Sequence, residues 1–200
     1  METKKENADI KHFNRRAATY ETSRSQSYFF DRVQRMVLNL VQNGSNPETI
    51  LDVGCGTGRL LRKAKKRWPS VRLIGVDAAE KMIEQATQLF PQAEFHVAMA
   101  ETLPLPDASV DLAFSTLSFH HWSNQAKGIS EIARVLRPQG RFLLADITIP
   151  FWLSLFVKRF KRKGPTRIRE MFVEAGLTVE LQQRPWRWSW VILVTVGRKP

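Results

Sequence analysis

The stretch Ile50-Leu51-Asp52-Val53-Gly54-Cys55-Gly56-Thr57-Gly58 constrains the fold of this chain more than any other. Its first half is apolar and ends near an acid, which predicts a buried strand. The alternating glycines then predict a tight turn that leads into a helix near Thr57. Glycine permits positive φ and a close approach of the backbone to a ligand, and the first turn of a helix has free N–H groups. The stretch therefore predicts a nucleotide-binding loop, although its G-x-G-x-G spacing differs from the G-x-G-x-x-G of dinucleotide-binding folds.

A second acidic residue follows the next predicted strand, which is expected at residues 71–77. Asp77 lies 23 residues after Gly54, close to the spacing of about 20 at which an acid meets ribose hydroxyls in nucleotide-binding folds. A carboxylate can accept two hydrogen bonds from a cis-diol, which lysine, serine or an apolar residue cannot do in that geometry. We therefore interpret Asp77 as a ribose-binding residue.

The rest of the chain alternates between helical and strand-like apolar periodicity. Residues 12–41 predict two helices joined near the serine-rich residues 22–27, whereas the polar residues 1–9 are expected to be frayed. Further helices are expected at residues 59–67, 79–89, 126–136 and 166–175, and further strands at 94–98, 109–116, within 134–146, at 177–181 and at 186–196. This alternation predicts an α/β fold in which helices cover both faces of a parallel sheet.

Four segments resemble, in the family's order, motifs of the class I S-adenosylmethionine-dependent methyltransferases, small-molecule branch, which includes the ubiquinone- and menaquinone-type (methyltransferase type 11) enzymes. They are the lead-in F-x-x-x-A-x-x-Y-[DE] at residues 13–21, the glycine stretch at 51–58, the segment at 99–107 and the turn and strand at 134–146. Two residues depart from the family pattern. Met99 replaces the acid that usually receives the adenine amino group, and Gln139 replaces a common glycine. The adenine contact is therefore expected from the backbone, from Glu101 or from neither.

The resemblance implies a three-layer, Rossmann-like fold with a seven-stranded, mostly parallel sheet whose last strand is antiparallel. It also implies S-adenosyl-L-methionine as the cofactor, with Tyr20 closing over its methionine end. Asp52 would act on the cofactor's amino group directly or through water, and Asp77 on its ribose. The expected cofactor-binding residues are Tyr20, Asp52, Gly54, Cys55, Gly56, Asp77, Ala78, Met82, Met99, Ala100, Glu101, Ser115 and Thr116.

Two adjacent histidines, His120 and His121, follow the fourth predicted strand. Ligands bind at the carboxyl ends of the strands in open α/β sheets, so the pair is expected near the methyl group of the cofactor. Either imidazole could take a proton from an oxygen, nitrogen or acidic carbon acceptor near neutral pH. The alternative is a structural His-His-Trp corner, which is common in the resembling family.

The chain is strongly basic, with a formal net charge of +12 and a pI near 10.3. This charge favours association with something anionic but does not identify the partner. Cys55 is the single cysteine, which excludes an intramolecular disulfide and a cysteine-rich metal site and is compatible with a reducing compartment. No metal is expected. The first residues have no apolar core typical of a secretory signal, and no apolar run reaches the roughly 18 residues of a spanning helix.

The length of 200 residues predicts a single domain spanning residues 1–200. Within it we expect an N-terminal helical cap at 1–45, a cofactor-binding core at 46–148, and a final helix with two strands at 165–200. Between them, residues 149–164 combine aromatic and basic side chains at helical spacing. This segment is expected to be either a lid on the acceptor pocket or a dock on an anionic membrane surface.

The leading hypothesis is a methyltransferase that transfers a methyl group from S-adenosylmethionine to a small-molecule or lipid-like acceptor. We expect a cytoplasmic protein, with peripheral membrane contact as an alternative. A nucleic-acid methyltransferase is less favoured, because the fourth strand lacks the [DN]-P-P-[YF] signature and the basic residues are dispersed. A basic binding module with an inactive cofactor pocket is the alternative outside enzymes.

Overall fold

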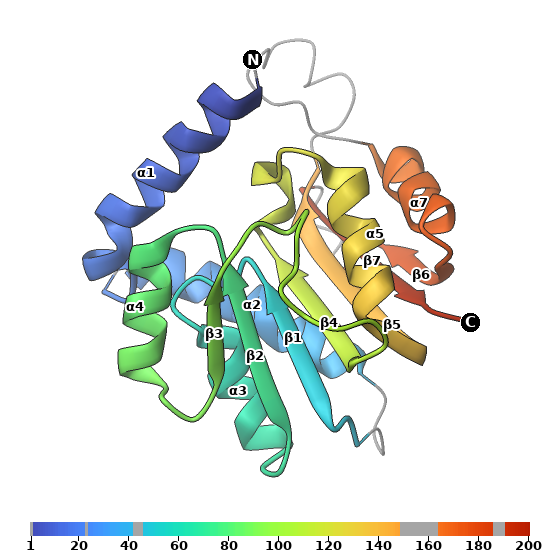
Figure 1. Cartoon of the computed structure of the whole chain (residues 1–200), viewed down its shortest axis with the longest axis horizontal. Helices are drawn as coiled ribbons and strands as arrows, with labels where there is room; N and C mark the ends of the chain where they lie inside the picture. The colour runs from blue at the N-terminus through green and yellow to red at the C-terminus, as the bar shows by residue number, and fades with distance from the viewer. Residues whose placement is uncertain (1, 23, 42–45, 149–163, 186–190) are drawn as a thin grey trace.

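The computed structural model describes residues 2–22, 24–41, 46–148, 164–185 and 191–200. Its core is a seven-stranded sheet (Figure 1). The strands are β1 (Thr49–Val53), β2 (Arg72–Asp77), β3 (Glu94–Val97), β4 (Val110–Thr116), β5 (Leu136–Ile147), β6 (Thr178–Gln183) and β7 (Ile192–Arg198). They lie in the order β3-β2-β1-β4-β5-β7-β6. The pairs among β1 to β5 are parallel, and β7 runs antiparallel to both β5 and β6, so the expected fold class is confirmed.

Helices cover both faces of this sheet. They are α1 (Glu2–Tyr20), α2 (Arg24–Leu40), α3 (Arg59–Arg67), α4 (Glu80–Leu89), α5 (Gln125–Val135) and α7 (Pro165–Glu174), with a short 3₁₀ helix η1 (Phe119–His121). Apolar residues of α2 and α3 pack on one face, and those of α5 and α7 on the other. α1 packs on α4 in a smaller apolar cluster beside the sheet (Figure 1).

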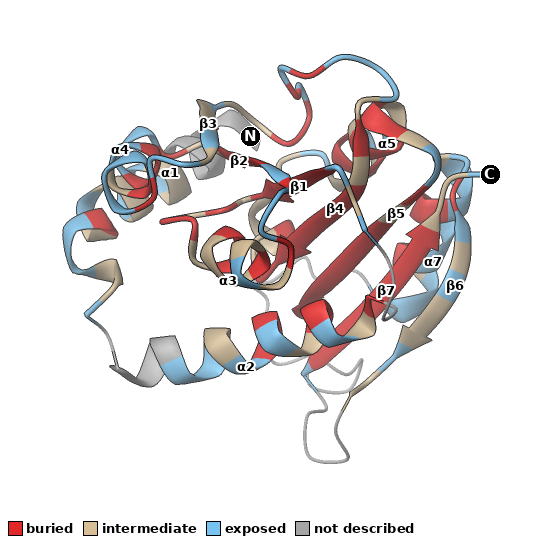
Figure 2. Cartoon of the chain, turned by 90° about the horizontal axis from the view of Figure 1, so that it is seen from below, coloured by how far each residue is buried: buried red, intermediate tan, exposed pale blue. Residues whose placement is uncertain are grey.

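Burial on both faces explains why the central strands are mainly apolar. Every residue of β1 is buried, whereas the edge strand β6 is only partly buried and α2 combines buried and exposed residues (Figure 2). In α3 the buried side chains are Leu60, Leu61 and Ala64, and the basic side chains lie on the other face. Each large apolar side chain removed from water in this way stabilises the fold by about 1.5–3 kcal/mol.

The structure corrects two expectations for the ends of elements. Residues 2–9 belong to α1, so the expectation that they are frayed is wrong. The apolar spacing of the helix extends back to Ile10, which the sequence interpretation did not use. β5 begins at Leu136 and includes the expected turn, where Gln139 has a φ of 66°. This left-handed conformation explains why glycine is common at that position in the resembling family.

Two other expectations fall outside the described residues. They are the basic aromatic segment, of which residues 149–163 are not described, and the first part of the expected last strand, residues 186–190. The described part of that strand begins at Ile192. Its antiparallel pairing with β6 agrees with the hairpin expected from the sequence.

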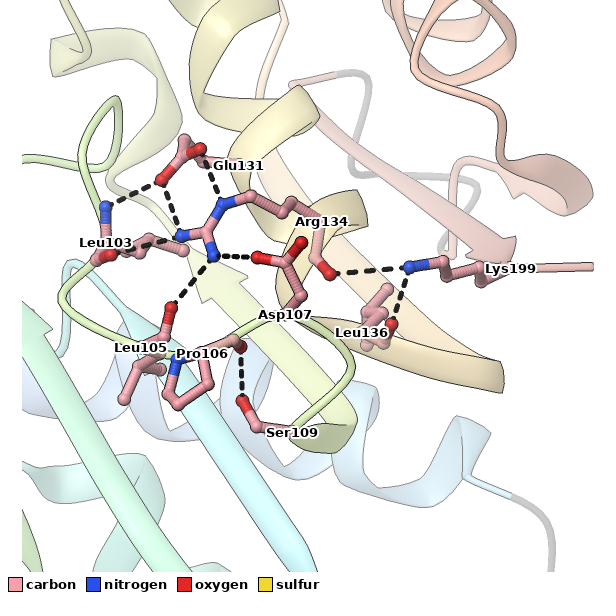
Figure 3. A network of polar contacts seen from close by, with 9 residues as sticks. All are labelled: Leu103, Leu105, Pro106, Asp107, Ser109, Glu131, Arg134, Leu136 and Lys199. Carbon is pink, nitrogen blue, oxygen red and sulfur yellow. Dashed lines mark hydrogen bonds and ion pairs between the residues drawn. The ribbon is translucent and has the colours of Figure 1, made fainter.

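Arg134, near the end of α5, holds the connection between β3 and β4 in place (Figure 3). Its guanidinium donates to both carboxylate oxygens of Glu131 at 2.9 Å, and to the carbonyl oxygens of Leu103 at 3.1 Å and Leu105 at 2.9 Å. It also donates to Asp107 at 2.6 Å. Bidentate, charge-assisted bonds of this kind are stronger than neutral ones. The arginine therefore fixes a segment that begins with the expected adenine-binding residues.

We expect Arg134→Ala to lower the free energy of unfolding by about 2 kcal/mol, because it leaves half-buried carbonyl and carboxylate groups without their donor. Urea denaturation measures this change. Arg167→Ala is a matched control, since Arg167 pairs with Glu170 and Glu174 of its own helix on the exposed surface. Such pairs contribute little, so equal transitions in the two variants would contradict the assignment.

Candidate functional site

The glycine loop after β1 is shaped by close contacts on both sides. Gly54 has a φ of 75°, and a Cβ there would lie 2.3 Å from Ser118 Cβ. The backbone N–H groups of Gly54 and Cys55 both donate to the Val76 carbonyl oxygen of β2, at 2.7 and 3.1 Å. A Cβ at Gly56 would meet only Tyr20 Cε1 within 4 Å, at 3.8 Å. The loop thus requires glycine at position 54 and leaves open space above position 56.

Asp77, at the end of β2, binds this loop with its side chain. Its Oδ2 accepts the Gly56 backbone N–H at 2.9 Å, and its Oδ1 accepts that of Ala79 at 2.9 Å. Burial raises the pKa of Asp77, while these two hydrogen bonds lower it. Each carboxylate oxygen retains a lone pair after accepting one bond. The carboxylate can therefore hold the loop and still accept hydroxyl groups of a bound diol.

The end of α1 closes over the loop. Tyr20 is half-buried against it, and burial, with a contribution from Asp77, raises the pKa of Tyr20 to about 12. The next residue, Glu21, accepts a hydrogen bond from the Thr57 hydroxyl and forms ion pairs with Arg59 at 3.2 Å and Arg62 at 3.0 Å. These contacts connect α1 to the first turn of α3. They keep the phenol of Tyr20 above the glycine loop.

The wall beyond β3 carries Met99, Ala100 and Glu101. Glu101 is 8% exposed, and its Oε1 accepts the Asn124 backbone N–H at 2.7 Å. Its Oε2 is buried and has no hydrogen-bond partner among the described residues. A buried oxygen without a partner is costly unless a ligand supplies a donor. Of the candidates for the adenine contact, Glu101 is therefore the side chain with a free acceptor.

Asp52 lies behind the loop. It is 1% exposed, and its Oδ1 has no partner in the described part of the chain. Burial, with a smaller effect of Asp77, raises the pKa of Asp52 to about 8. Its carboxyl group is thus largely protonated at neutral pH in the protein without a ligand.

The two histidines of η1 have different partners. His120 Nδ1 lies 2.7 Å from Oδ1 of the buried Asp146, and the His120 backbone N–H donates to Asp146 Oδ2 at 3.1 Å. His121 Nδ1 lies 3.1 Å from Asp9 Oδ2, which belongs to α1. The fold therefore separates the pair: His120 is tied to β5 and His121 to the N-terminal helix.

These elements surround a cavity of about 120 Å³. Most of the expected cofactor-binding residues line it: Tyr20, Gly54, Cys55, Gly56, Asp77, Ala78, Met82, Met99, Ala100, Glu101 and Thr116. Of the two histidines, His121 lies on the cavity wall. Asp52, Ser115 and His120 do not line it. The Ser115 hydroxyl is hydrogen-bonded to that of Ser118 at 2.8 Å.

The sequence interpretation assigned no role to several other residues of the wall, among them Asp9, Phe13, Phe30, Arg59 and Trp122. Phe13 belongs to the lead-in motif, and its ring packs edge-on against His121 with centroids 5.0 Å apart. Arg59 directly follows the glycine stretch, so its place in the sequence could have indicated that it lies at the site. Asp9 gave no signal, because its partner lies 112 residues away in the sequence.

Comparison with known proteins gives a consistent picture. Residues 51–144 match the family described as "Methyltransferase domain". The chain is 32% identical over 119 residues to a demethylmenaquinone methyltransferase of Thermotoga maritima, covering 60% of this chain and 50% of that protein. It is 34% identical over 137 residues to a malonyl-[acyl-carrier protein] O-methyltransferase of Hahella chejuensis, covering 68% of this chain and 48% of that protein. The chain thus spans about half the length of these curated relatives.

Solved structures show the same fold. An S-adenosylmethionine-dependent methyltransferase from Aquifex aeolicus superposes with a TM-score of 0.70 at 21% identity, covering 96% of this chain and 98% of that one. The conserved topology and the family match agree with the motifs found in the sequence. Residues 51–144 therefore match the methyltransferase-domain family, and the chain has the fold of a solved S-adenosylmethionine-dependent methyltransferase.

Proposed function

We propose that the chain transfers the methyl group of S-adenosylmethionine to a small-molecule or lipid-like acceptor. The observation that carries this proposal is the cavity itself, which is lined by a glycine loop, by a carboxylate after β2 and by Glu101, whose Oε2 has no partner among the described residues. The cofactor supplies a sulfonium methyl group that is already activated for displacement. The protein must then align donor and acceptor and exclude water.

The residues present fit this cofactor. Open space above Gly56 allows close approach of a ligand, and Asp77 can accept the two ribose hydroxyls while it holds the loop. We assign the adenine amino group to Glu101 Oε2, because this oxygen has no other donor among the described residues. Tyr20 would close over the methionine end.

The lining of the cavity favours an apolar or aromatic acceptor. Beside the expected cofactor contacts it contains Ile10, Phe13, Phe30, Leu117 and Trp122. Two of the relatives described above are named for demethylmenaquinone and for malonyl-[acyl-carrier protein], and the first of these is an acceptor of this kind. A small-molecule or lipid-like acceptor is therefore favoured over a nucleic acid.

Membrane docking and an inactive cofactor pocket both stay predictions. No helix among the described residues is long and apolar enough to cross a membrane, and the segment expected to dock on a membrane surface lies mostly outside those residues. A binding module with an inactive pocket remains the alternative outside enzymes.

Turnover is tested by incubating the protein and a heavy-methyl cofactor with a host extract, and mass spectrometry then identifies the labelled acceptor. The absence of a labelled product would favour the binding module.

We expect Asp77→Ala to weaken S-adenosylmethionine binding by about 1–3 kcal/mol, or about 5- to 150-fold, because the ribose loses its acceptor and Gly56 loses its anchor. Calorimetry measures this affinity. His120→Ala is the control, since its ring does not lie on the cavity wall. Equal affinities in wild type and Asp77→Ala would contradict the ribose assignment.

The raised pKa of Asp52 makes the stability of the protein depend on pH. Its pKa rises from an ordinary 3.8 to about 8 on folding, so the folded protein takes up a proton, and stability is lost as pH rises between these values. Asn cannot ionise and avoids this loss. We expect the free energy of unfolding of Asp52→Asn, relative to wild type without ligand, to rise by more than about 1 kcal/mol between pH 5 and pH 8. Urea denaturation at both pH values checks this, and a constant difference would contradict it.

A further inference from the structure

Asp9 and His121 form a carboxylate–imidazole pair on the cavity wall. The 3.1 Å contact joins Asp9 Oδ2 of α1 to Nδ1 of His121 in η1. Both residues line the cavity, and both side chains are about two-thirds buried, with exposures of 30% and 33%. Because His121 lines the cavity, its imidazole is in reach of a molecule that binds there.

The surroundings of His121 fix both the ring and its protonation state. The Phe13 ring packs edge-on at 5.0 Å, and the His120 ring lies at 4.0 Å on another side. Burial lowers the pKa of His121, and His120 lowers it further, whereas Asp9 and Asp146 raise it. The neutral imidazole therefore predominates at neutral pH. A carboxylate at Nδ1 selects the tautomer that carries its proton there, and Nε2 is left as the free acceptor.

His120 also has a carboxylate at Nδ1, but this second pair lies outside the cavity lining. Both its Nδ1 and its backbone N–H bond to Asp146, which is 2% exposed and also accepts the Ile147 backbone N–H at 2.5 Å. Its ring does not line the cavity. His120 thus connects η1 to β5, and the two histidines have different tasks.

We propose that Asp9 is a positioning residue that orients His121 as the general base of the methyl transfer, so that the acceptor is one that must lose a proton: a hydroxyl, an amine or an acidic carbon. This inference rests on the proposed function. It makes the N-terminal helix part of the active site, because the base is oriented only when α1 is docked.

The methyl transfer breaks one bond to the methyl carbon for the bond that it forms. An electron pair of the acceptor atom forms a bond to the methyl carbon, and the carbon–sulfur bond breaks with its electron pair passing to sulfur, which leaves neutral S-adenosylhomocysteine. The acceptor's proton passes to Nε2 of His121. The resulting imidazolium keeps its Nδ1–H bonded to Asp9, whose negative charge stabilises it, and later releases the Nε2 proton to solvent.

The test uses the full chain with ¹⁵N-labelled histidine and S-adenosylhomocysteine as the probe ligand. Long-range ¹H–¹⁵N spectra between pH 5 and pH 9 report the tautomer and the titration midpoint of His121, which is assigned with His121→Gln. We expect the Nδ1–H tautomer to dominate in wild type. In Asp9→Asn we expect this dominance to be lost and the midpoint to move to lower pH, because the carboxylate that favours the imidazolium is gone.

Asn14→Ala is the matched control. Asn14 is on the same helix and accepts the Lys81 backbone N–H at 2.9 Å, so this variant removes one contact of α1 with α4 and leaves the contact of Asp9 with His121 in place. Unchanged tautomer and midpoint in Asp9→Asn would overturn the proposal, as would equal changes in Asn14→Ala. Asp9→Ala repeats the test if Asp9→Asn does not fold.

The same spectra without ligand keep the two proposals apart. If calorimetry shows no binding of S-adenosylhomocysteine to wild type, the proposed function fails. The titration of the free protein then still reports whether Asp9 controls the imidazole. If the ligand binds and Asp9→Asn leaves His121 unchanged, only the positioning role is overturned.

Discussion

The site depends on the two hydrogen bonds that Asp77 accepts from Gly56 and Ala79. They connect the glycine loop after β1 to the start of the segment that leads into α4. One carboxylate therefore sets the distance between the connections that follow β1 and β2. Burying a carboxylate is costly unless its oxygens accept hydrogen bonds. The backbone donors make this position tolerable, and they also orient the carboxylate toward the cavity. The group that binds the ribose in our proposal is therefore the same group that shapes the loop.

Part of the cavity wall is made by α1, which is held by polar contacts as well as by apolar packing. Asn14 accepts a backbone N–H of α4, Glu21 pairs with Arg59 and Arg62 of α3, and Asp9 contacts His121 of η1. The apolar cluster under α1 is small, with Ala17, Ala79 and Met82 as its buried members. Elements with few buried apolar contacts open locally at low free energy. A wall of this kind suits the proposed reaction, in which the site must admit two substrates and then exclude water.

The sequence predicted the parts of this architecture that are local. The strand-turn-helix of the glycine stretch, the acid after β2 and the alternation of strands and helices each follow from residues close together in the chain, and the structure has all of them. Contacts between distant segments could not be predicted. The sequence interpretation treated residues 1–9 as frayed and gave His120 and His121 the same role. Only the packing of α1 onto η1 separates the two rings, because it brings Asp9 to one of them.

The net positive charge is a second property whose structural role could not be predicted from the sequence alone. The sequence of α3 has basic residues opposite its apolar side chains. In the structure, Arg62 pairs with Glu21, Lys63 donates to Asp31 and Gln34, and Arg67 donates to backbone carbonyls at the end of α2. These cations join α2 and α1 to α3, and bonds of this kind leave them poorly placed to bind phosphates of a nucleic acid, which need accessible cations. The net charge of +12 therefore cannot be read as a binding surface on this helix. Four other cations are concentrated in the sequence at residues 158–162.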